Sequence, residues 1–311
     1  MIVDAHTHVF SRVAGRIEAG PVRGVGYGQI RIGNSTILLM PPLNASVRHT
    51  PKMLISAMDW AKVDRAVLLQ GPFYGECNDY VLEAVTAYPD RLSAAAYFDP
   101  WAKASMQRRQ DLEAILAVPA YRAIKLECSV PTGFYGLYPH VCLNDPNLDW
   151  IWSELASADL VLTLDLGAVG TRSYQTETVH RIATHHPTLK IVIAHLGQPL
   201  PSMTAEPPLW QAWCEQIDLG KLPNVWFDTA ALPYYVEPEP YPFPTVEKYL
   251  HAAIDRIGPA KIMFGTDTPS LLRIASYRQL IDVFKCHIAA LSATEKAMLL
   301  GRNAVDVYGK T

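Results

Sequence analysis

The chain opens with Met1-Ile2-Val3-Asp4-Ala5-His6-Thr7-His8-Val9-Phe10, and this stretch carries the first signs of both the fold and the site. Its apolar residues between Ile2 and Ala5 are typical of a short buried strand. Because residues two apart on a strand share a face, we expect His6 and His8 to point the same way. Two imidazoles aimed at one point form part of a metal site, although a His-X-His pair alone also occurs without one.

The composition is typical of a globular protein and favours a small molecule as its substrate. The 311 residues are 50% hydrophobic and 18% charged, which is enough apolar sequence for a large core. The formal net charge is -3 and no run of Lys or Arg occurs, so nucleic acid and an anionic membrane are disfavoured as partners. We therefore expect a small-molecule substrate.

The cysteines and the start of the chain indicate a compartment. The five cysteines are widely spaced and include no Cys-X-X-Cys pair, which is typical of reduced thiols. The chain enters its first strand without a basic and apolar leader, and it contains no apolar run of membrane-spanning length. We expect a cytoplasmic protein.

A segment from about residue 11 to 51 interrupts the pattern after the first strand. Within it, two short β-rich runs, 29–32 and 36–39, are joined by Gly33-Asn34-Ser35, which predicts a β-hairpin. Because the hairpin follows the first strand, it would lie over the mouth of a barrel. It would act there as a lid or as a decoration.

From residue 52 onward, strands and helices alternate. After the first strand, apolar or β-rich runs occur at 66–71, 92–100, 123–128, 160–167, 190–197, 225–229 and 261–269. Helical stretches are predicted at 52–62, 78–88, 107–116, 147–157, 175–186, 245–257 and, at the end of the chain, 293–308. Eight apolar strands separated by helices predict a single α/β domain, a distorted (β/α)8 TIM barrel spanning 1–311. A doubly wound sheet is disfavoured because no glycine-rich turn follows the first strand.

Polar residues stand at the carboxyl ends of most of these strands, where a TIM barrel builds its active site. They are His6, His8, Lys125, Glu127, Asp165, His195, Asp228 and Asp267. A charged group after an apolar run is costly unless it is paired or binds a metal. Each could have a structural role, and Asp228 is assigned one here as a carboxylate behind the ligands. The set as a whole predicts a metal centre.

The chain resembles the amidohydrolase superfamily, in particular the branch of aminocarboxymuconate-semialdehyde decarboxylase, aromatic-acid decarboxylases and pyrone-dicarboxylate lactonase. The resemblance spans nearly the whole chain and rests on short motifs in a fixed order. These are 4–8 (DAHTH), 88–91 (YPDR) with 99–100 (DP), 124–126 (IKL), 145–146 (DP) with 152–156 (WSELA), 194–197 (AHLG), 265–269 (GTDTP) and 301–304 (GRNA). It implies a distorted TIM barrel in which His6, His8 and Asp267 bind one divalent metal. His195 would be a ligand or would polarise the substrate.

The chain departs from its relatives at two strand ends. Asp165 stands where relatives usually carry a histidine, and Glu127 stands where many have one. The candidate ligands thus become His6, His8, Glu127, Asp165, His195 and Asp267. This set has more ligands than one tetrahedral zinc uses. The sequence is therefore compatible with one or two ions of zinc, iron or manganese, and Glu127 could bridge two of them.

The main prediction is a metal-dependent hydrolase of a small cyclic or aromatic carboxylic acid with an ester, lactone or amide bond. Asp267 would move the proton, and His195 would stabilise the oxyanion. The alternatives are a non-oxidative decarboxylase of an unsaturated or aromatic acid, a carboxylate-bridged di-iron oxygenase and a metal-free lactonase. A barrel that only binds a ligand would leave the strand ends unexplained.

Substrate binding is predicted from the aromatic loops at the mouth. We expect Tyr135, Arg172 and Tyr234 to bind the substrate, since aromatic rings and an arginine suit a flat or cyclic acid. The resemblance further implies a homodimer.

Overall fold

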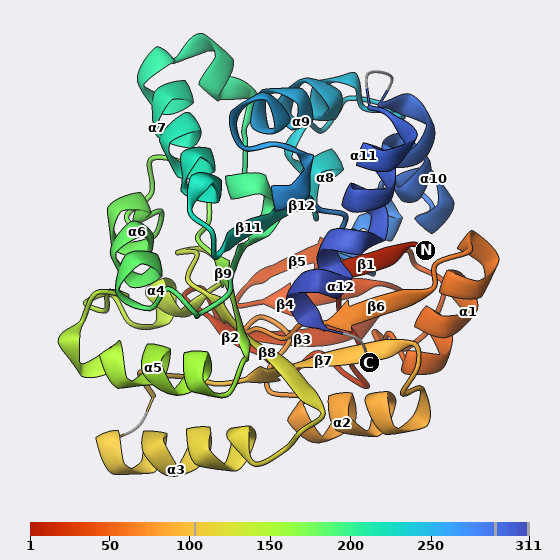
Figure 1. The fold of residues 1–311 in the computed structure, drawn as a ribbon. Coiled ribbons are helices and arrows are strands. Elements are labelled where there is room, and N and C mark those ends of the chain that lie inside the picture. The colour runs from red at the N-terminus through yellow and green to blue at the C-terminus, as the bar shows by residue number, and fades with distance from the viewer. Residues whose placement is uncertain (103, 289–290, 310–311) are drawn as a thin grey trace.

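The structure is a computed structural model that describes residues 1–102, 104–288 and 291–309. Its centre is a sheet of eight parallel strands in the order β1-β6-β7-β8-β9-β10-β11-β12. The strands are β1 Val3–Thr7, β6 Arg65–Leu68, β7 Leu92–Tyr97, β8 Tyr121–Glu127, β9 Val161–Asp165, β10 Ile191–Ile193, β11 Val225–Asp228 and β12 Ile262–Met263. This confirms the predicted TIM-like barrel, in which every predicted β-rich run supplies one strand (Figure 1).

The barrel closes between its first and last strands. The backbone N–H of Ala5 donates to the carbonyl of Phe264 at 2.9 Å, and a parallel bridge joins Thr7 to Thr268. β12 itself is only two residues long, because the chain turns toward the barrel centre after Met263. The closure is therefore made by the segment that carries Asp267.

Helices cover the outside of the barrel (Figure 1). The longer ones are α1 Pro51–Ala61, α2 Asn78–Ala87, α3 Ser105–Leu116, α5 Asp149–Ser157, α6 Thr176–His185, α7 Pro207–Ile217 and α9 Pro244–Ile257. Shorter ones are α4 Phe134–Leu137, α8 Leu232–Tyr235, α10 Tyr277–Asp282, α11 Ala293–Ala297 and α12 Asn303–Tyr308. The predicted helices are confirmed to within a few residues, and α4, α7, α8 and α10 are additional. None of the helices within the described ranges is long and apolar enough to cross a membrane.

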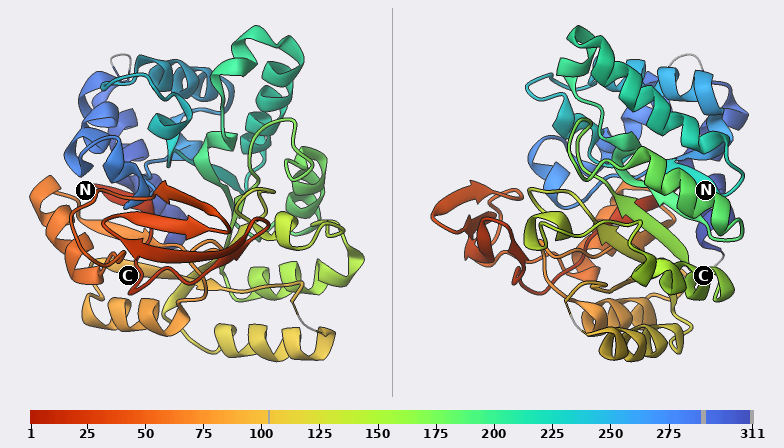
Figure 2. Two further views of the ribbon diagram at one scale, coloured as in Figure 1. Left: turned by 180° about the vertical axis from the view of Figure 1, so that it is seen from behind. Right: turned by 90° about the vertical axis from the view of Figure 1, so that its left-hand side faces the viewer.

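The two ends of the barrel are covered differently. At the amino end, α12 crosses the barrel and the hydroxyl groups of its Tyr308 and of Thr163 in β9 lie 3.1 Å apart (Figure 1). At the other end stands the insertion, an antiparallel sheet in the order β2-β3-β4-β5 (Figure 2). Its strands are β2 Arg16–Ile17, β3 Gly20–Gly26, β4 Gln29–Ile32 and β5 Ser35–Leu38. The predicted hairpin is thus confirmed as β4 and β5 and enlarged by two strands.

The insertion has its own small core and is joined to the barrel by backbone contacts. Phe10, Val22, Ile30 and other buried side chains pack together beneath its sheet. The N–H of Arg16 donates to the carbonyl of Pro72 at 2.9 Å, in the loop after β6. These contacts hold the sheet over the carboxyl end of the barrel.

Candidate active site

A cavity of about 360 Å³ opens at the carboxyl end of the barrel, beneath the insertion. Strand ends and loops far apart in the sequence supply its walls. Of the predicted site residues, His8, Glu127, Asp165, His195, Asp267 and Tyr234 line it. His6 is fully buried, and its ring lies 5.2 Å from that of His8 and 4.8 Å from that of His195. The barrel therefore brings all six predicted metal ligands into one region.

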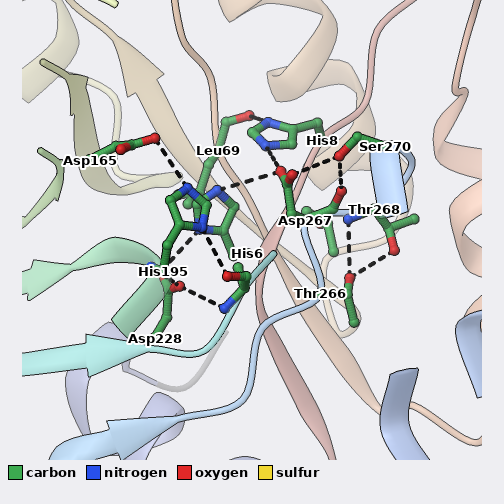
Figure 3. A network of polar contacts seen from close by, with 12 residues as sticks. His6, His8, Leu69, Asp165, His195, Asp228, Thr266, Asp267, Thr268 and Ser270 are labelled. Carbon is green, nitrogen blue, oxygen red and sulfur yellow. Dashed lines mark hydrogen bonds and ion pairs between the residues drawn. The ribbon is translucent and has the colours of Figure 1, made fainter. Parts of the chain in front are cut away.

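His6 is held as a neutral imidazole with one nitrogen free to bind a cation. Its Nδ1 lies 3.0 Å from Oδ2 of Asp228, which can only accept, so Nδ1 carries the proton (Figure 3). Its Nε2 lies 3.4 Å from the ammonium of Lys125, which can only donate. Burial and the positive charge of Lys125 lower the pKa of His6 well below its ordinary value.

His8 faces an acceptor on each side of its ring. Nδ1 lies 2.9 Å from the carbonyl oxygen of Leu69, and Nε2 lies 2.9 Å from Oδ1 of Asp267 (Figure 3). Burial lowers the pKa of His8, so the neutral form with one N–H is favoured. A neutral His8 has one N–H for two acceptors: on Nε2 it donates to Asp267, and on Nδ1 it donates to Leu69 and leaves Nε2 and Oδ1 of Asp267 to share a cation.

His195 carries a proton on each nitrogen. Nδ1 donates to the carbonyl oxygen of Ala230 at 3.0 Å, and Nε2 donates to Oδ2 of Asp165 at 3.1 Å. Burial alone would lower its pKa, but the negative charge of Asp165 outweighs burial and raises the pKa to about 9. With Nε2 committed to Asp165, His195 fits a cationic donor better than a metal ligand.

Asp267 and His195 both adopt the left-handed backbone conformation, with φ of 61° and 60°. This conformation costs a non-glycine residue about 1 kcal/mol and is found at sites where the surroundings impose it. The N–H of Asp267 donates to the carbonyl of His6 at 2.8 Å, and the N–H of His195 donates to Oδ1 of Asp228 at 2.9 Å. The strands therefore end early, and both side chains turn into the barrel centre.

Asp267 is a carboxylate with its two oxygens in different roles. Oδ1 faces His8, whereas Oδ2 accepts a hydrogen bond from the hydroxyl group of Ser270 at 2.6 Å. Burial would raise its pKa, but the hydrogen bond from His8 and the positive charge of His195 lower it below the ordinary value. Asp267 is thus ionised at neutral pH.

Glu127 and Asp165 lie side by side around Lys125. They are paired in register on β8 and β9, and each has a carboxylate oxygen 3.9 Å from Nζ of Lys125. All three side chains are buried. Burial raises the pKa of Glu127 to about 7. Glu127 is therefore less fully ionised than Asp165 at neutral pH and attracts the ammonium group of Lys125 less strongly.

Two groups of histidine and aspartate side chains in the described ranges have ligand atoms within 4.8 Å of one another. One is His6, His8 and Asp267, and the other is His6, His195 and Asp228. In the second group, Asp228 already accepts from His6, from His195 and from the N–H of Ala230 at 3.0 Å. Asp228 therefore orients the histidines, as predicted. The first group fits a divalent ion, with two imidazoles and a carboxylate as donors.

Two of the predicted substrate-binding residues lie away from the cavity. Tyr135 is buried, and its hydroxyl accepts from the N–H of Leu143 at 2.8 Å. Arg172 donates to the carbonyl oxygen of Tyr135, and its guanidinium lies 5.1 Å from the ring centroid of that tyrosine. Neither lines the cavity, because α4 after β8 and the loop after β9 pack against each other through this contact. Tyr234 does line it.

The structure adds cavity residues that the sequence analysis did not assign. Arg273 lines the wall, its guanidinium 5.0 Å from the ring centroid of Tyr234 and one nitrogen 3.5 Å from a carboxylate oxygen of Glu237. Tyr74 and Tyr235 also line it, and burial raises both phenol pKa values, so both remain protonated. The phenols could be expected from their place after strand ends, but Arg273 follows Asp267 by six residues and has no motif of its own.

A cluster of buried imidazoles and carboxylates at the carboxyl end of a parallel β/α barrel defines a barrel enzyme with a candidate metal centre. The family model described as amidohydrolase matches residues 3–310, so the chain belongs to the amidohydrolase family. It is an enzyme of that family, as the sequence motifs predicted.

Similar solved structures share the fold over nearly the whole chain. An amidohydrolase from Burkholderia multivorans with bound zinc has a TM-score of 0.70 at 18% identity, with 99% of both chains covered. A probable 2-pyrone-4,6-dicarboxylic acid hydrolase from Acinetobacter baumannii with citric acid bound has a TM-score of 0.67 at 19% identity, covering 99% of this chain and 98% of the other.

One curated relative matches a short part of the chain. It is L-fucono-1,5-lactonase of Burkholderia multivorans (strain ATCC 17616 / 249), which is 39% identical over 64 residues. The match spans 20% of this chain and 22% of the length of that relative.

Replacing Asp228 tests its role behind the histidines. We expect Asp228→Asn to weaken zinc affinity by about 10- to 100-fold, because the amide no longer fixes the proton on Nδ1 of His6. The measurement is a zinc titration against a competing chromophoric chelator. Asp218→Asn is the control, since Asp218 pairs with Arg256 at 2.7 Å outside the cavity. Unchanged zinc affinity in Asp228→Asn would contradict this role.

Proposed function

We propose that this protein is a metal-dependent hydrolase that opens a small lactone bearing a carboxylate. The observation that carries the proposal is the group of ligand atoms from His6, His8 and Asp267, which lie within 4.8 Å of one another next to a cavity that also holds a cationic His195 and Arg273. Two of the similar proteins are named for the hydrolysis of a pyrone-dicarboxylic acid and of a sugar lactone, and both compounds are cyclic esters.

The residues that would hold the metal are His6, His8 and Asp267. The Nδ1 atoms of both histidines are occupied by acceptors, so their Nε2 lone pairs are available for a divalent ion. An ion held there lowers the pKa of a bound water and polarises a carbonyl group. Zinc suits this set of two imidazoles and one carboxylate.

One ion per chain is proposed, because Lys125 already supplies a positive charge to the remaining carboxylates. Its Nζ lies 3.9 Å from oxygens of both Glu127 and Asp165, where a second ion would have to bind. Neither carboxylate belongs to the two candidate metal groups found among the described residues. A carboxylate-bridged pair of iron ions would need Glu127 and Asp165 as ligands, so this arrangement disfavours the di-iron oxygenase.

Asp267 is placed to accept the proton of the attacking water. It is ionised, it lies at the edge of the cavity, and the hydroxyl group of Ser270 fixes the direction of its Oδ2. As water adds to the carbonyl carbon, its proton passes to Asp267. When the bond between the carbonyl carbon and the ring oxygen breaks, Asp267 returns the proton to that oxygen, and the product is a hydroxy acid.

Protonated donors line the cavity where negative charge would develop on the carbonyl oxygen. His195 is a cation that is held in place by Asp165 and Ala230. The hydroxyl groups of Tyr74 and Tyr235 stay protonated. Fixed donors of this kind stabilise an oxyanion without having to reorient during the reaction.

Arg273 is the proposed partner of the carboxylate of the substrate. Its contact with Glu237 uses few of its five N–H donors, and stacking on Tyr234 fixes its plane. A carboxylate is bound well by two parallel N–H groups of an arginine. Decarboxylation of an unsaturated or aromatic acid and metal-free lactone hydrolysis stay alternative predictions that the experiments below separate.

The number of ions is tested with Lys125. We expect wild-type protein saturated with zinc to hold one ion per chain, and Lys125→Met to hold more than one, because Glu127 and Asp165 lose their positive partner. Lys125→Arg keeps the charge and should stay at one ion. Metal content after gel filtration is the measurement. Two ions in the wild type, or one in Lys125→Met, would contradict the assignment.

The reaction is tested on a panel of carboxylated five- and six-membered lactones. We expect hydrolysis that is lost on dialysis against a chelator and restored by zinc. Asp267→Asn should lower kcat by about 10²- to 10⁴-fold, since it removes the proton acceptor. Asp255→Asn on the surface of α9 is the control. Hydrolysis that survives the chelator would favour the metal-free lactonase, and carbon dioxide release would favour the decarboxylase.

The carboxylate site is tested with Arg273→Met. We expect KM for a carboxylated lactone to rise at least about tenfold, as a charged hydrogen-bonded pair is lost. KM for the methyl ester of the same lactone should barely change. Arg172→Met is the matched control because Arg172 lies outside the cavity. An equal effect of Arg273→Met on the acid and its ester would rule out this contact.

A further inference from the structure

The insertion places two exposed aliphatic side chains at the mouth of the active-site cavity. Ile37 and Leu38 of β5 are 46% and 42% exposed, and both line the cavity. The next residue, Leu39, also lines it but is buried in the core of the insertion, and its N–H donates to the carbonyl of Gly28 at 2.8 Å. The pair is thus held over the cavity by an anchored neighbour.

The position of β5 explains why both residues reach the cavity. Neighbouring residues of a strand point to opposite faces, and Ile37 pairs with the buried Ile30 whereas Leu38 pairs with the exposed Gln29. β5 is the edge strand of its sheet, so nothing in that sheet covers its outer side. Both side chains line the cavity, so this edge can present them to a bound molecule.

The remaining walls are mixed in a way that suits an amphipathic substrate. Phe73 and Leu271 add apolar surface to the cavity. Among the described residues that line it, Gln198 is the one carboxamide, and its Oε1 is buried without a hydrogen-bond partner. A buried acceptor of this kind is costly unless a ligand donates to it. Beside the hydroxyl and carboxylate groups of its other walls, the cavity therefore offers an acceptor without a partner at Gln198, one arginine, and apolar surface at the hairpin.

The aliphatic pair at the mouth disfavours a substrate that places hydroxyl groups against the hairpin. Hydroxyls that lie against Ile37 and Leu38 would lose their bonds to water and gain none, which costs free energy for each group. An alkyl or aryl group in the same place would cover exposed apolar surface, which is favourable in proportion to the area removed from water.

We propose that the substrate lactone carries an apolar alkyl or aryl substituent and that Ile37 and Leu38 bind it, which makes this pair specificity-determining. The inference rests on the proposed function and narrows its substrate class. The carboxylate of the substrate faces Arg273, the ester carbonyl faces Asp267 and His195, and the substituent extends to the hairpin.

The test uses carboxylated lactones whose side chain grows from hydrogen to methyl, propyl and pentyl. For the wild type, kcat/KM should rise roughly threefold to fourfold for each methylene group that reaches the hairpin. In the double variant Ile37→Thr/Leu38→Gln the gain should fall below about twofold over the whole series. Val25→Ser is the matched control, because Val25 is 44% exposed on the same insertion but does not line the cavity.

Calorimetric binding of the corresponding open-chain hydroxy acids separates this inference from the reaction itself. The same dependence of affinity on chain length is expected whether or not the lactones turn over. Affinity that rises with chain length, and does so less in the double variant, supports the hairpin even if hydrolysis is absent. A flat series in the wild type, or an equal slope in wild type and double variant, overturns the inference.

Discussion

The active site depends on the carboxylate of Asp228 at the end of β11. It is fully buried, and its two oxygens accept from the ring of His6, from the backbone N–H of His195 and from the N–H of Ala230. One carboxylate thus connects three strand ends at the barrel centre. Burial raises the pKa of Asp228, and these donors offset part of that rise. Without it, the proton on His6 and the left-handed turn at His195 would lose their common support.

Around this anchor the site balances opposite charges out of contact with bulk water. The carboxylates of Asp165 and Asp267 face the cationic His195 and the Nε2 of His8, and Lys125 lies between the two halves of the cluster. A buried charge without a partner is costly, so each of these residues constrains the others. One part of the cluster, His6, His8 and Asp267, fits a divalent ion. The other part, Glu127 and Asp165, lies around the ammonium group of Lys125. In the proposed function, a single cluster of polar strand ends would serve both metal binding and proton transfer.

The insertion stands over this cluster, and three of its residues line the cavity. It is held by its own core and by backbone contacts to the loop after β6, so its edge strand has a defined place above the cavity. Enzymes of this architecture vary their substrates by changing the loops at the carboxyl end while the barrel stays the same. In this chain the loop after β1 has become a small sheet, and its edge brings aliphatic side chains to a site whose base is ionic.

The sequence by itself determined the barrel, because alternating apolar strands and helices have few other ways to bury their apolar faces. It also determined which strand ends carry polar groups, and so located His6, His8, His195 and Asp267 and the structural role of Asp228. Only the tertiary structure decided how these groups pair. The separation of Glu127 and Asp165 from the group His6, His8 and Asp267 depends on the position of one flexible lysine, Lys125, and side-chain pairing across a barrel has no sequence spacing. The same reason applies to the cavity wall. Tyr135 and Arg172 lie in the segments after β8 and β9, which pack against each other, whereas Arg273 and the hairpin pair Ile37 and Leu38 reach the cavity through the path of the chain in space.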